Sequence, residues 1–289
     1  MTPAAQGAAA SIGTTEHKQV DLPQGAIAYR EVGSGPPVVF VHGLLVDGRL
    51  WDGVADELAG RARCIVADWP MGAHRLPMKP DADLSPPGTV STIAGFIEAL
   101  GLDDVTLVGN DTGGAICQIL VTSRPERIGR LVLTNCDSYE HFPPGPFKLM
   151  PPIAKLPGGM AAMAAPFRIG ALRRATFSQL VKHPVDPHLP DSWLEAALQD
   201  RDVMRDLAKF TAGVNKRYTL EAAGRFGQLE MPVLLAWGTD DRFFKLSHAE
   251  RLAEAIPNSR IEKIDDARTF VPLDQPAAVA DAIAGHIAP

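Results

Sequence analysis

Short apolar runs rich in β-branched residues alternate with stretches whose apolar residues recur at helical spacing, and this alternation constrains the fold most. Residues 18–41 have a pattern typical of β-strands and end in a run typical of a buried strand at 38–41. Further runs of this kind lie at 63–67, 105–108, 131–134, 232–237 and 260–264. Helical patterns lie between and after them at 50–58, 90–100, 113–122, 247–256 and 276–287. Because right-handed crossovers join strands that alternate with helices, we predict an α/β fold with a mostly parallel, twisted sheet flanked by helices.

The alternation stops between residues 137 and 225, where no strand pattern occurs. This stretch opens with the proline-rich segment HFPPGPFKLMPPIAKLPGG and continues with a helical pattern over 193–210. Helices inserted into a parallel sheet are expected over the carboxyl ends of its strands, where ligands bind in such sheets. We therefore predict a core formed by residues 16–137 and 226–289, a helical cap at 138–225, and a disordered tail at 1–15.

The strongest motif is Gly109-Asn110-Asp111-Thr112-Gly113, which follows one apolar run and opens a helical pattern. Small residues around a sharp strand-to-helix turn expose the central side chain at the edge of the sheet, beside a helix N-terminus. This pattern is a nucleophile elbow, with Asp111 where serine is usual. An aspartate before a helix can also be an ordinary N-cap. The His42-Gly43 pair after one strand and GTDDRFF after another favour the elbow, since both belong at the same sheet edge.

With these motifs, the chain resembles the α/β-hydrolase family over about residues 20–287. The aspartate at the elbow makes it similar to the branch that holds epoxide hydrolases and haloalkane dehalogenases. In that branch a carboxylate attacks carbon and forms an ester, a histidine activates water to cleave it, and a second acid orients the histidine. The resemblance implies Asp111 as the nucleophile, the backbone N–H groups of Leu44 and Thr112 as oxyanion donors, and Asp241, rather than Asp240, as the orienting acid.

The water-activating base departs from the family pattern. The family carries its histidine in a segment like D-x-x-H-F-x-P, and here the segment is DARTFVP, so Thr269 stands at the histidine position. A threonine hydroxyl cannot accept a proton near neutral pH, nor pair with Asp241 as an imidazolium does. Ordinary two-step hydrolysis therefore lacks the group that catalyses its second step.

Four other side chains are candidates for part of this task. His74 and His141 follow core strands in loops at the expected carboxyl edge, so either could face the site as a base. Asp137 stands where some relatives place their orienting acid; otherwise it caps a helix or faces water. Tyr218, near the end of the predicted cap, could donate to an epoxide oxygen, as cap tyrosines do in epoxide hydrolases; otherwise it packs structurally.

Five further histidines are expected to have no catalytic role. We expect His42 to support the turn beside the oxyanion donors. The other four are expected on the solvated surface: His17, His183, His248 and His286.

Two absences narrow the substrate. Dehalogenases of this branch hold halide with a tryptophan after the nucleophile and an asparagine after the His-Gly turn, whereas Thr112 and Leu44 occupy those positions here. The expected substrate is therefore a small, largely apolar electrophile, most simply an epoxide. Two alternatives stay open: a non-hydrolytic enzyme that uses Asp111 for proton transfer, elimination or cyclisation, and a ligand-binding protein without catalysis.

Composition limits the expected partners. Lys and Arg number 28 and Asp and Glu 34, and the net charge of −6 gives no electrostatic footprint for nucleic acid or an anionic membrane. No apolar run is long enough for a membrane span. Cys64, Cys117 and Cys136 are too few and scattered for a disulfide framework or a zinc site, which is typical of a reduced, cytoplasmic protein. Neither a cofactor nor a metal is expected, and a homodimer stays open.

Overall fold

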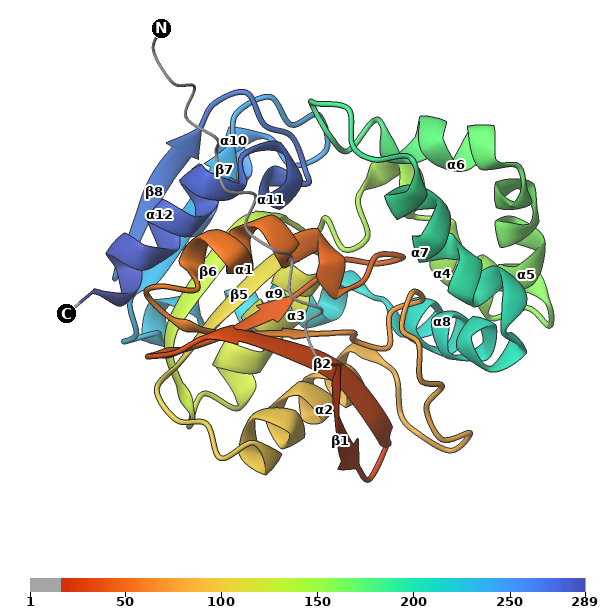
Figure 1. Ribbon diagram of the computed structural model, residues 1–289, viewed down its shortest axis with the longest axis horizontal. Coiled ribbons are helices and arrows are strands. Elements are labelled where there is room, and N and C mark those ends of the chain that lie inside the picture. The colour runs from red at the N-terminus through yellow and green to blue at the C-terminus, as the bar shows by residue number, and fades with distance from the viewer. Residues whose placement is uncertain (1–16, 289) are drawn as a thin grey trace, which may run out of the picture.

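A single sheet of eight strands organises the computed structural model, which describes residues 17–288 (Figure 1). The strand order is β1-β2-β4-β3-β5-β6-β7-β8. Their bounds are β1 Lys18–Leu22, β2 Gly25–Gly33, β3 Pro37–Val41, β4 Arg63–Ala67, β5 Val105–Asp111, β6 Ile128–Cys136, β7 Val233–Gly238 and β8 Ser259–Ile264. β2 pairs antiparallel with β1 and β4, and every later pairing is parallel. The predicted mostly parallel α/β sheet is confirmed, and the tail predicted at 1–15 lies outside the described residues.

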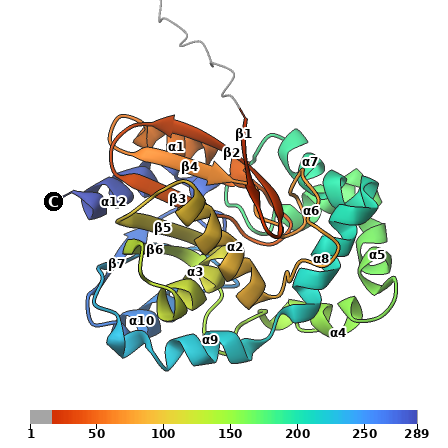
Figure 2. The ribbon, with the colours of Figure 1, turned by 90° about the horizontal axis from the view of Figure 1, so that it is seen from below.

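Both faces of the sheet are covered because its strands are apolar at successive positions. In β3, Val39 and Val41 belong to one buried cluster, and Val38 and Phe40 belong to the other. The first cluster packs under α2 (Pro86–Ala99), α3 (Thr112–Ser123), α9 (Lys216–Ala223) and α10 (Leu246–Ala255). The second packs under α1 (Asp52–Leu58), α11 (Val271–Asp274) and α12 (Pro276–Ile287). Figure 2 shows α1 and α2–α3 on opposite sides of the sheet.

Helices fill the chain between β6 and β7, in the stretch predicted to lack strands. They are α4 (Met150–Ala154), α5 (Gly159–Ala164), α6 (Gly170–Phe177), α7 (His188–Gln199) and α8 (Arg201–Gly213), followed by α9. Short 3-10 turns lie in the same stretch at Gly145–Phe147, Ala165–Arg168 and Phe226–Gln228, and another follows β3 at Gly48–Trp51. We call α4–α8 the helical insertion, which lies beside the sheet in Figure 1. α9 instead packs against α3, in the layer that covers the sheet.

The single helical pattern predicted over 193–210 is wrong in one respect, because two helices occupy it. Asp200 has an extended backbone between α7 and α8, and its carboxylate accepts the backbone N–H groups of Asp202 and Val203, at 2.7 and 3.3 Å. This N-cap starts a new helix and turns the chain, while the apolar spacing continues across the break.

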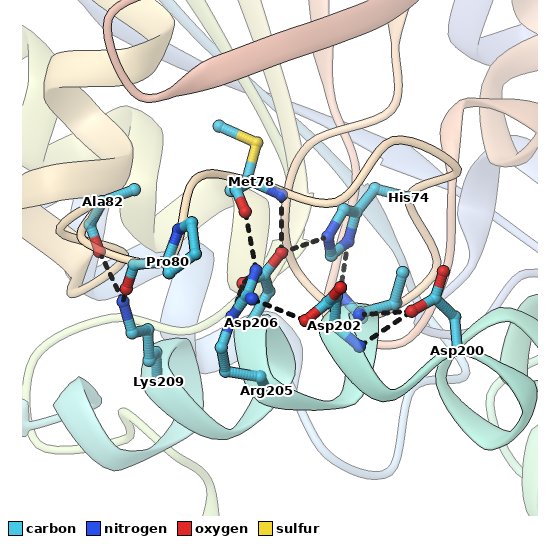
Figure 3. A network of polar contacts seen from close by, with 11 residues as sticks. His74, Met78, Pro80, Ala82, Asp200, Asp202, Arg205, Asp206 and Lys209 are labelled. Atoms are coloured by element: carbon cyan, nitrogen blue, oxygen red, sulfur yellow. Dashed lines mark hydrogen bonds and ion pairs between the residues drawn. The ribbon is translucent and has the colours of Figure 1, made fainter.

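A buried carboxylate fastens the helical insertion to the loop after β4 (Figure 3). Asp206 of α8 is fully buried, and its Oδ2 accepts the Met78 backbone N–H at 2.7 Å and lies 3.3 Å from His74 Nε2. Arg205 bridges Asp206 Oδ1, at 2.8 Å, and the Met78 carbonyl, at 2.6 Å. Burial opposes ionisation of Asp206, but its bonds with His74, Met78 and Arg205 outweigh burial and hold its pKa below the usual value.

None of the described helices combines the length and apolar character needed to cross a membrane.

The Asp206 contacts predict a pH-dependent loss of stability. Asp206→Ala leaves buried polar partners unpaired and should lower the free energy of unfolding by about 3–5 kcal/mol. Because the folded pKa of Asp206 lies below its unfolded value, this contribution is present above about pH 4 and is lost as pH falls through the folded pKa. The measurement is urea unfolding of both proteins from pH 3 to pH 7.

Asp202→Ala is the matched control, because Asp202 also pairs with Arg205 but its side chain is 63% exposed. It should cost less than about 1 kcal/mol. Equal effects of the two variants, or a loss at Asp206 that grows toward acid pH, would contradict this account.

Candidate functional site

Asp111 lies at the sharp turn from β5 into α3, with a backbone φ of 52° and ψ of −130°. A positive φ of this kind is uncommon outside glycine. The neighbouring glycines permit the turn because the backbone packs closely: a Cβ on Gly113 would collide with the carbonyl oxygens of Val41 and His42. One on Gly109 would lie 2.8 Å from the Gly114 Cα. The motif therefore brings the end of β5 against the end of β3.

The Asp111 carboxylate faces the backbone N–H groups of Leu44 and Thr112. The Leu44 N–H donates to its Oδ2 at 3.2 Å, and the nearby Thr112 N–H favours the ionised form and lowers the pKa of the carboxyl group. A Cβ on Gly43 would collide with Oδ2, so a residue without a side chain is required beside this oxygen. Burial raises the pKa of Asp111 to about 6, although the bonds from Thr112 and Leu44 oppose the rise. The carboxylate is therefore mostly ionised at neutral pH.

Asp111 opens into a largely apolar cavity of about 100 Å³. The proline-rich segment after β6 supplies much of its wall, together with residues of the helical insertion. The lining residues are Leu44, Leu45, Asp111, Thr112, Phe142, Pro143, Pro144, Phe147, Met150, Pro151, Phe167, Thr176, Phe177, Leu180, Leu194 and Val214. No histidine is among them, and only Asp111, Thr112 and Thr176 carry polar side chains. The cavity suits a small apolar ligand brought against one carboxylate.

The side chains of Asp241 and Thr269 are hydrogen-bonded to each other. The Thr269 hydroxyl donates to Asp241 Oδ1 at 3.0 Å, and both residues are buried. The backbone N–H groups of Phe243 and Phe244 donate to the same oxygen, at 2.8 and 3.2 Å. Burial raises the pKa of Asp241 against these bonds. Thr269 is absent from the cavity lining, so it presents no base to a molecule bound there.

Two asparagines whose roles were not predicted from the sequence link β5 and β6 to the segments that carry Thr269 and Asp241. Asn110 Nδ2 donates to the Thr269 carbonyl at 2.7 Å and to the Thr134 hydroxyl at 2.8 Å. Asn135 donates to Asp241 Oδ2 at 2.8 Å and accepts the Gly238 N–H at 2.7 Å. Their signal was their position, since each is a polar residue near the carboxyl end of an otherwise apolar strand.

Asp137 is fully buried next to Asp111, and it neither faces water nor caps a helix. Its Oδ2 accepts the Thr112 hydroxyl at 3.2 Å, and its backbone N–H donates to the Asp111 carbonyl at 3.3 Å. Its Oδ1 has no hydrogen-bond partner among the described residues. Burial and the charge of Asp111 raise the pKa of Asp137 well above its usual value.

Three of the other candidates have partners away from the Asp111 cavity. His74 is buried against Asp206 rather than beside Asp111. His141 is 39% exposed, lies 3.7 Å from a Glu140 oxygen, and stacks on His248 with ring centroids 4.6 Å apart. Tyr218 accepts a hydrogen bond from Arg217 at 2.6 Å on α9. All three are outside the cavity lining, so the structure does not bring these candidates to Asp111.

The predicted surface positions of two histidines are also wrong. His286 is only 9% exposed, and His248 is half-buried against His141; burial lowers the pKa of both. His17 and His183 are exposed. His42 is fully buried, with Nδ1 2.9 Å from the Gly43 carbonyl and Nε2 accepting the Trp69 N–H at 2.8 Å. Burial lowers the pKa of His42 to about 4, so the ring is neutral and supports the turn before Leu44.

Within residues 17–288, no group of three or more His, Cys, Asp or Glu side chains is arranged to hold a metal ion. Cys64, Cys117 and Cys136 are buried thiols, and burial raises the pKa of each.

Comparisons with known proteins agree with this architecture. Haloalkane dehalogenase 2 of Mycobacterium tuberculosis is 26% identical over 280 residues, which cover 93% of each chain. An uncharacterized protein of the same organism is 27% identical over 271 residues, covering 89% of this chain and 76% of that protein. The solved structure of an epoxide hydrolase superposes with a TM-score of 0.78 at 20% identity, over 95% of this chain and 99% of the other, which shows a shared fold.

The family profile described as "alpha/beta hydrolase fold" matches residues 36–276. This span runs from β3 to the start of α12 and includes Asp111, Asp241 and Thr269. The chain therefore belongs to the alpha/beta hydrolase fold family.

Proposed function

We propose that the chain is a hydrolase-fold enzyme in which Asp111 attacks a small, largely apolar electrophile, most simply an epoxide, and forms an ester. The observation that carries this proposal is the Asp111 carboxylate, which opens into the apolar cavity with Oδ2 bound by the Leu44 N–H. A carboxylate that is mostly ionised in an apolar site is a competent nucleophile. Relatives named for haloalkane and epoxide chemistry support carbon as the point of attack.

The Leu44 and Thr112 N–H groups have a second task in this scheme. After attack, Cγ of Asp111 becomes the ester carbon, and the oxygen that accepts the Leu44 N–H becomes its carbonyl oxygen. Water attack on Cγ then places negative charge on that oxygen, which the two donors stabilise as an oxyanion hole. This arrangement favours a route through an acyl-type intermediate, because donors aimed at the Asp111 carboxylate serve best when Cγ is attacked.

The second step lacks the family's usual base. Thr269 stands at the histidine position, and its hydroxyl is committed to Asp241 rather than to the cavity. The cavity lining offers no imidazole to activate water. We therefore expect the ester on Asp111 to live long enough to be isolated. Epoxides are favoured over haloalkanes because Thr112 and Leu44 offer no tryptophan indole or asparagine amide for a departing halide.

Covalent labelling tests the nucleophile directly. Incubation with styrene oxide and, separately, 1-bromobutane should add one reagent mass per chain, located on Asp111 by peptide mapping and intact-mass spectrometry. Asp111→Asn should remove the adduct, because an amide is a poor nucleophile. Asp103→Asn, which changes a carboxylate that is 76% exposed, is the matched control and should be labelled like the unmodified protein.

The absence of any adduct on Asp111 with both reagents would contradict the proposal. Turnover that still requires Asp111 would then favour the non-hydrolytic alternative, in which Asp111 moves a proton. A retained ligand without conversion would favour the binding alternative, in which Asp111 only accepts the backbone donors.

Restoring an imidazole tests the second step. Thr269→His should shorten the lifetime of the ester by about 10²–10⁴, the usual contribution of a general base, because Asp241 is already in place to orient the ring. Thr269→Asn is the control, since it also enlarges this buried position but adds no base. The measurement is loss of the isolated adduct over time at pH 7.5. Equal adduct lifetimes in Thr269→His, Thr269→Asn and the unmodified protein would show that the base does not belong at residue 269.

A further inference from the structure

The proposed function gives no role to the buried carboxyl group of Asp137. Asp137 has no exposed surface, and its Oδ1 lacks a hydrogen-bond partner among the described residues. A buried polar atom without a partner is costly, and it calls for a reason. The groups that face this residue are Asp111 at the end of β5, the Thr112 hydroxyl and the Gln118 amide, which donates to its carbonyl at 2.8 Å. In the described part of the chain, no basic side chain forms an ion pair with Asp137.

Thr112 connects this carboxyl group to the cavity. Its hydroxyl lies 3.2 Å from Asp137 Oδ2, it directly follows Asp111 in the chain, and the residue itself lines the cavity. A hydroxyl can accept one proton while it donates another, so it can pass a proton between two groups that do not touch. Thr112 therefore touches Asp137 through its hydroxyl and also borders the cavity beside Asp111.

We infer that Asp137 and the Thr112 hydroxyl form a proton relay that supplies a proton when an epoxide opens and removes one from water when the ester is cleaved. This inference rests on the proposed function, because it needs an ester on Asp111. It accounts for both departures from the family pattern with one pair of residues. No tyrosine lines the cavity to protonate an epoxide oxygen, and no histidine lines it to activate water.

In the first step, an Asp111 oxygen forms a bond to an epoxide carbon and the ring C–O bond breaks. The ring oxygen takes the proton of the Thr112 hydroxyl, and Thr112 takes the proton of Asp137. The like charge of Asp111 is one reason why Asp137 holds this proton in the free enzyme. Ester formation removes that charge, so Asp137 becomes a carboxylate when its neighbour becomes neutral.

In the second step, the Asp137 carboxylate takes the Thr112 hydroxyl proton while Thr112 takes a proton from water. The water oxygen bonds to Cγ of the ester, and the resulting oxyanion lies on the Leu44 and Thr112 N–H groups. The bond from Cγ to the alcohol oxygen then breaks, and that oxygen takes the proton of the new Asp111 carboxyl group. A diol leaves, and the site returns to an ionised Asp111 beside a protonated Asp137.

Two reagents separate the relay from the nucleophile, because an epoxide needs a proton on opening whereas bromide leaves without one. The probes are styrene oxide and 1-bromobutane, and the readout is the ratio of their labelling rates at Asp111. Asp137→Asn and Thr112→Val should each lower the epoxide-to-bromide ratio by about 10² or more, and lengthen the ester lifetime by a similar factor. Thr112→Ser keeps the hydroxyl and should restore both values to within a few-fold.

Thr122→Val is the matched control, because Thr122 lies on the same helix and its hydroxyl donates to the Gln118 carbonyl at 2.8 Å. It should behave like the unmodified protein. Infrared difference spectra give a readout without turnover: the carbonyl stretch of a protonated carboxylic acid should be lost in Asp137→Asn and kept in Thr122→Val.

The outcomes distinguish the two proposals. Unchanged ratios and lifetimes in both Asp137→Asn and Thr112→Val would overturn the relay while the nucleophile stands. Labelling by bromobutane but not by the epoxide in the unmodified protein would also overturn the relay. Failure of both reagents would overturn the proposed function and the relay with it. If Asp137→Asn does not fold, the Thr112→Val and Thr112→Ser pair decides the question alone.

Discussion

The hydrogen bond from the Leu44 N–H to the Asp111 carboxylate is the interaction on which the site depends. It exists because β3 and β5 are parallel neighbours whose carboxyl ends meet at one edge of the sheet. The strained turn at Asp111, with a φ of 52°, aims the side chain back toward the loop after β3. The glycines beside it leave the room that this close approach needs. A larger residue at Gly43 would displace the carboxylate itself.

Two different environments meet at this carboxylate. Toward the mouth, the proline-rich segment and the helical insertion make an apolar wall that keeps water scarce and strengthens electrostatic effects. Behind it, Asp137, Asp241 and their hydroxyl and amide partners form a buried polar layer. Three carboxyl groups this close cannot all be ionised cheaply, so they share protons rather than cations. The Thr112 and Thr269 hydroxyls connect this layer, since each donates to one of the buried carboxyl groups.

The features that could be predicted from the sequence are those set by residues close together in the chain. Strands buried on both faces must be apolar at every position, so β3 to β7 were visible as short apolar runs, and the elbow was visible as a glycine-flanked turn. Pairings across long separations were not predictable. His74 lies in the loop after β4, but its partner Asp206 is 132 residues away in the chain. The helix break at Asp200 was not predictable, because an N-cap can end one helix and start another without changing the spacing of the apolar residues. Asn110 and Asn135 read as ordinary polar residues until their partners were placed.

The proposed function requires Asp111 to act as an ionised nucleophile whose buried environment raises its pKa. The most direct measurement is the rate of Asp111 alkylation by 1-bromobutane from pH 4.5 to pH 8, followed by intact mass. Burial raises the pKa of Asp111 to about 6, so the rate should rise about tenfold per pH unit below that value and level off above it. A rate that is already constant from pH 4.5, or one that falls as pH rises, would contradict the claim.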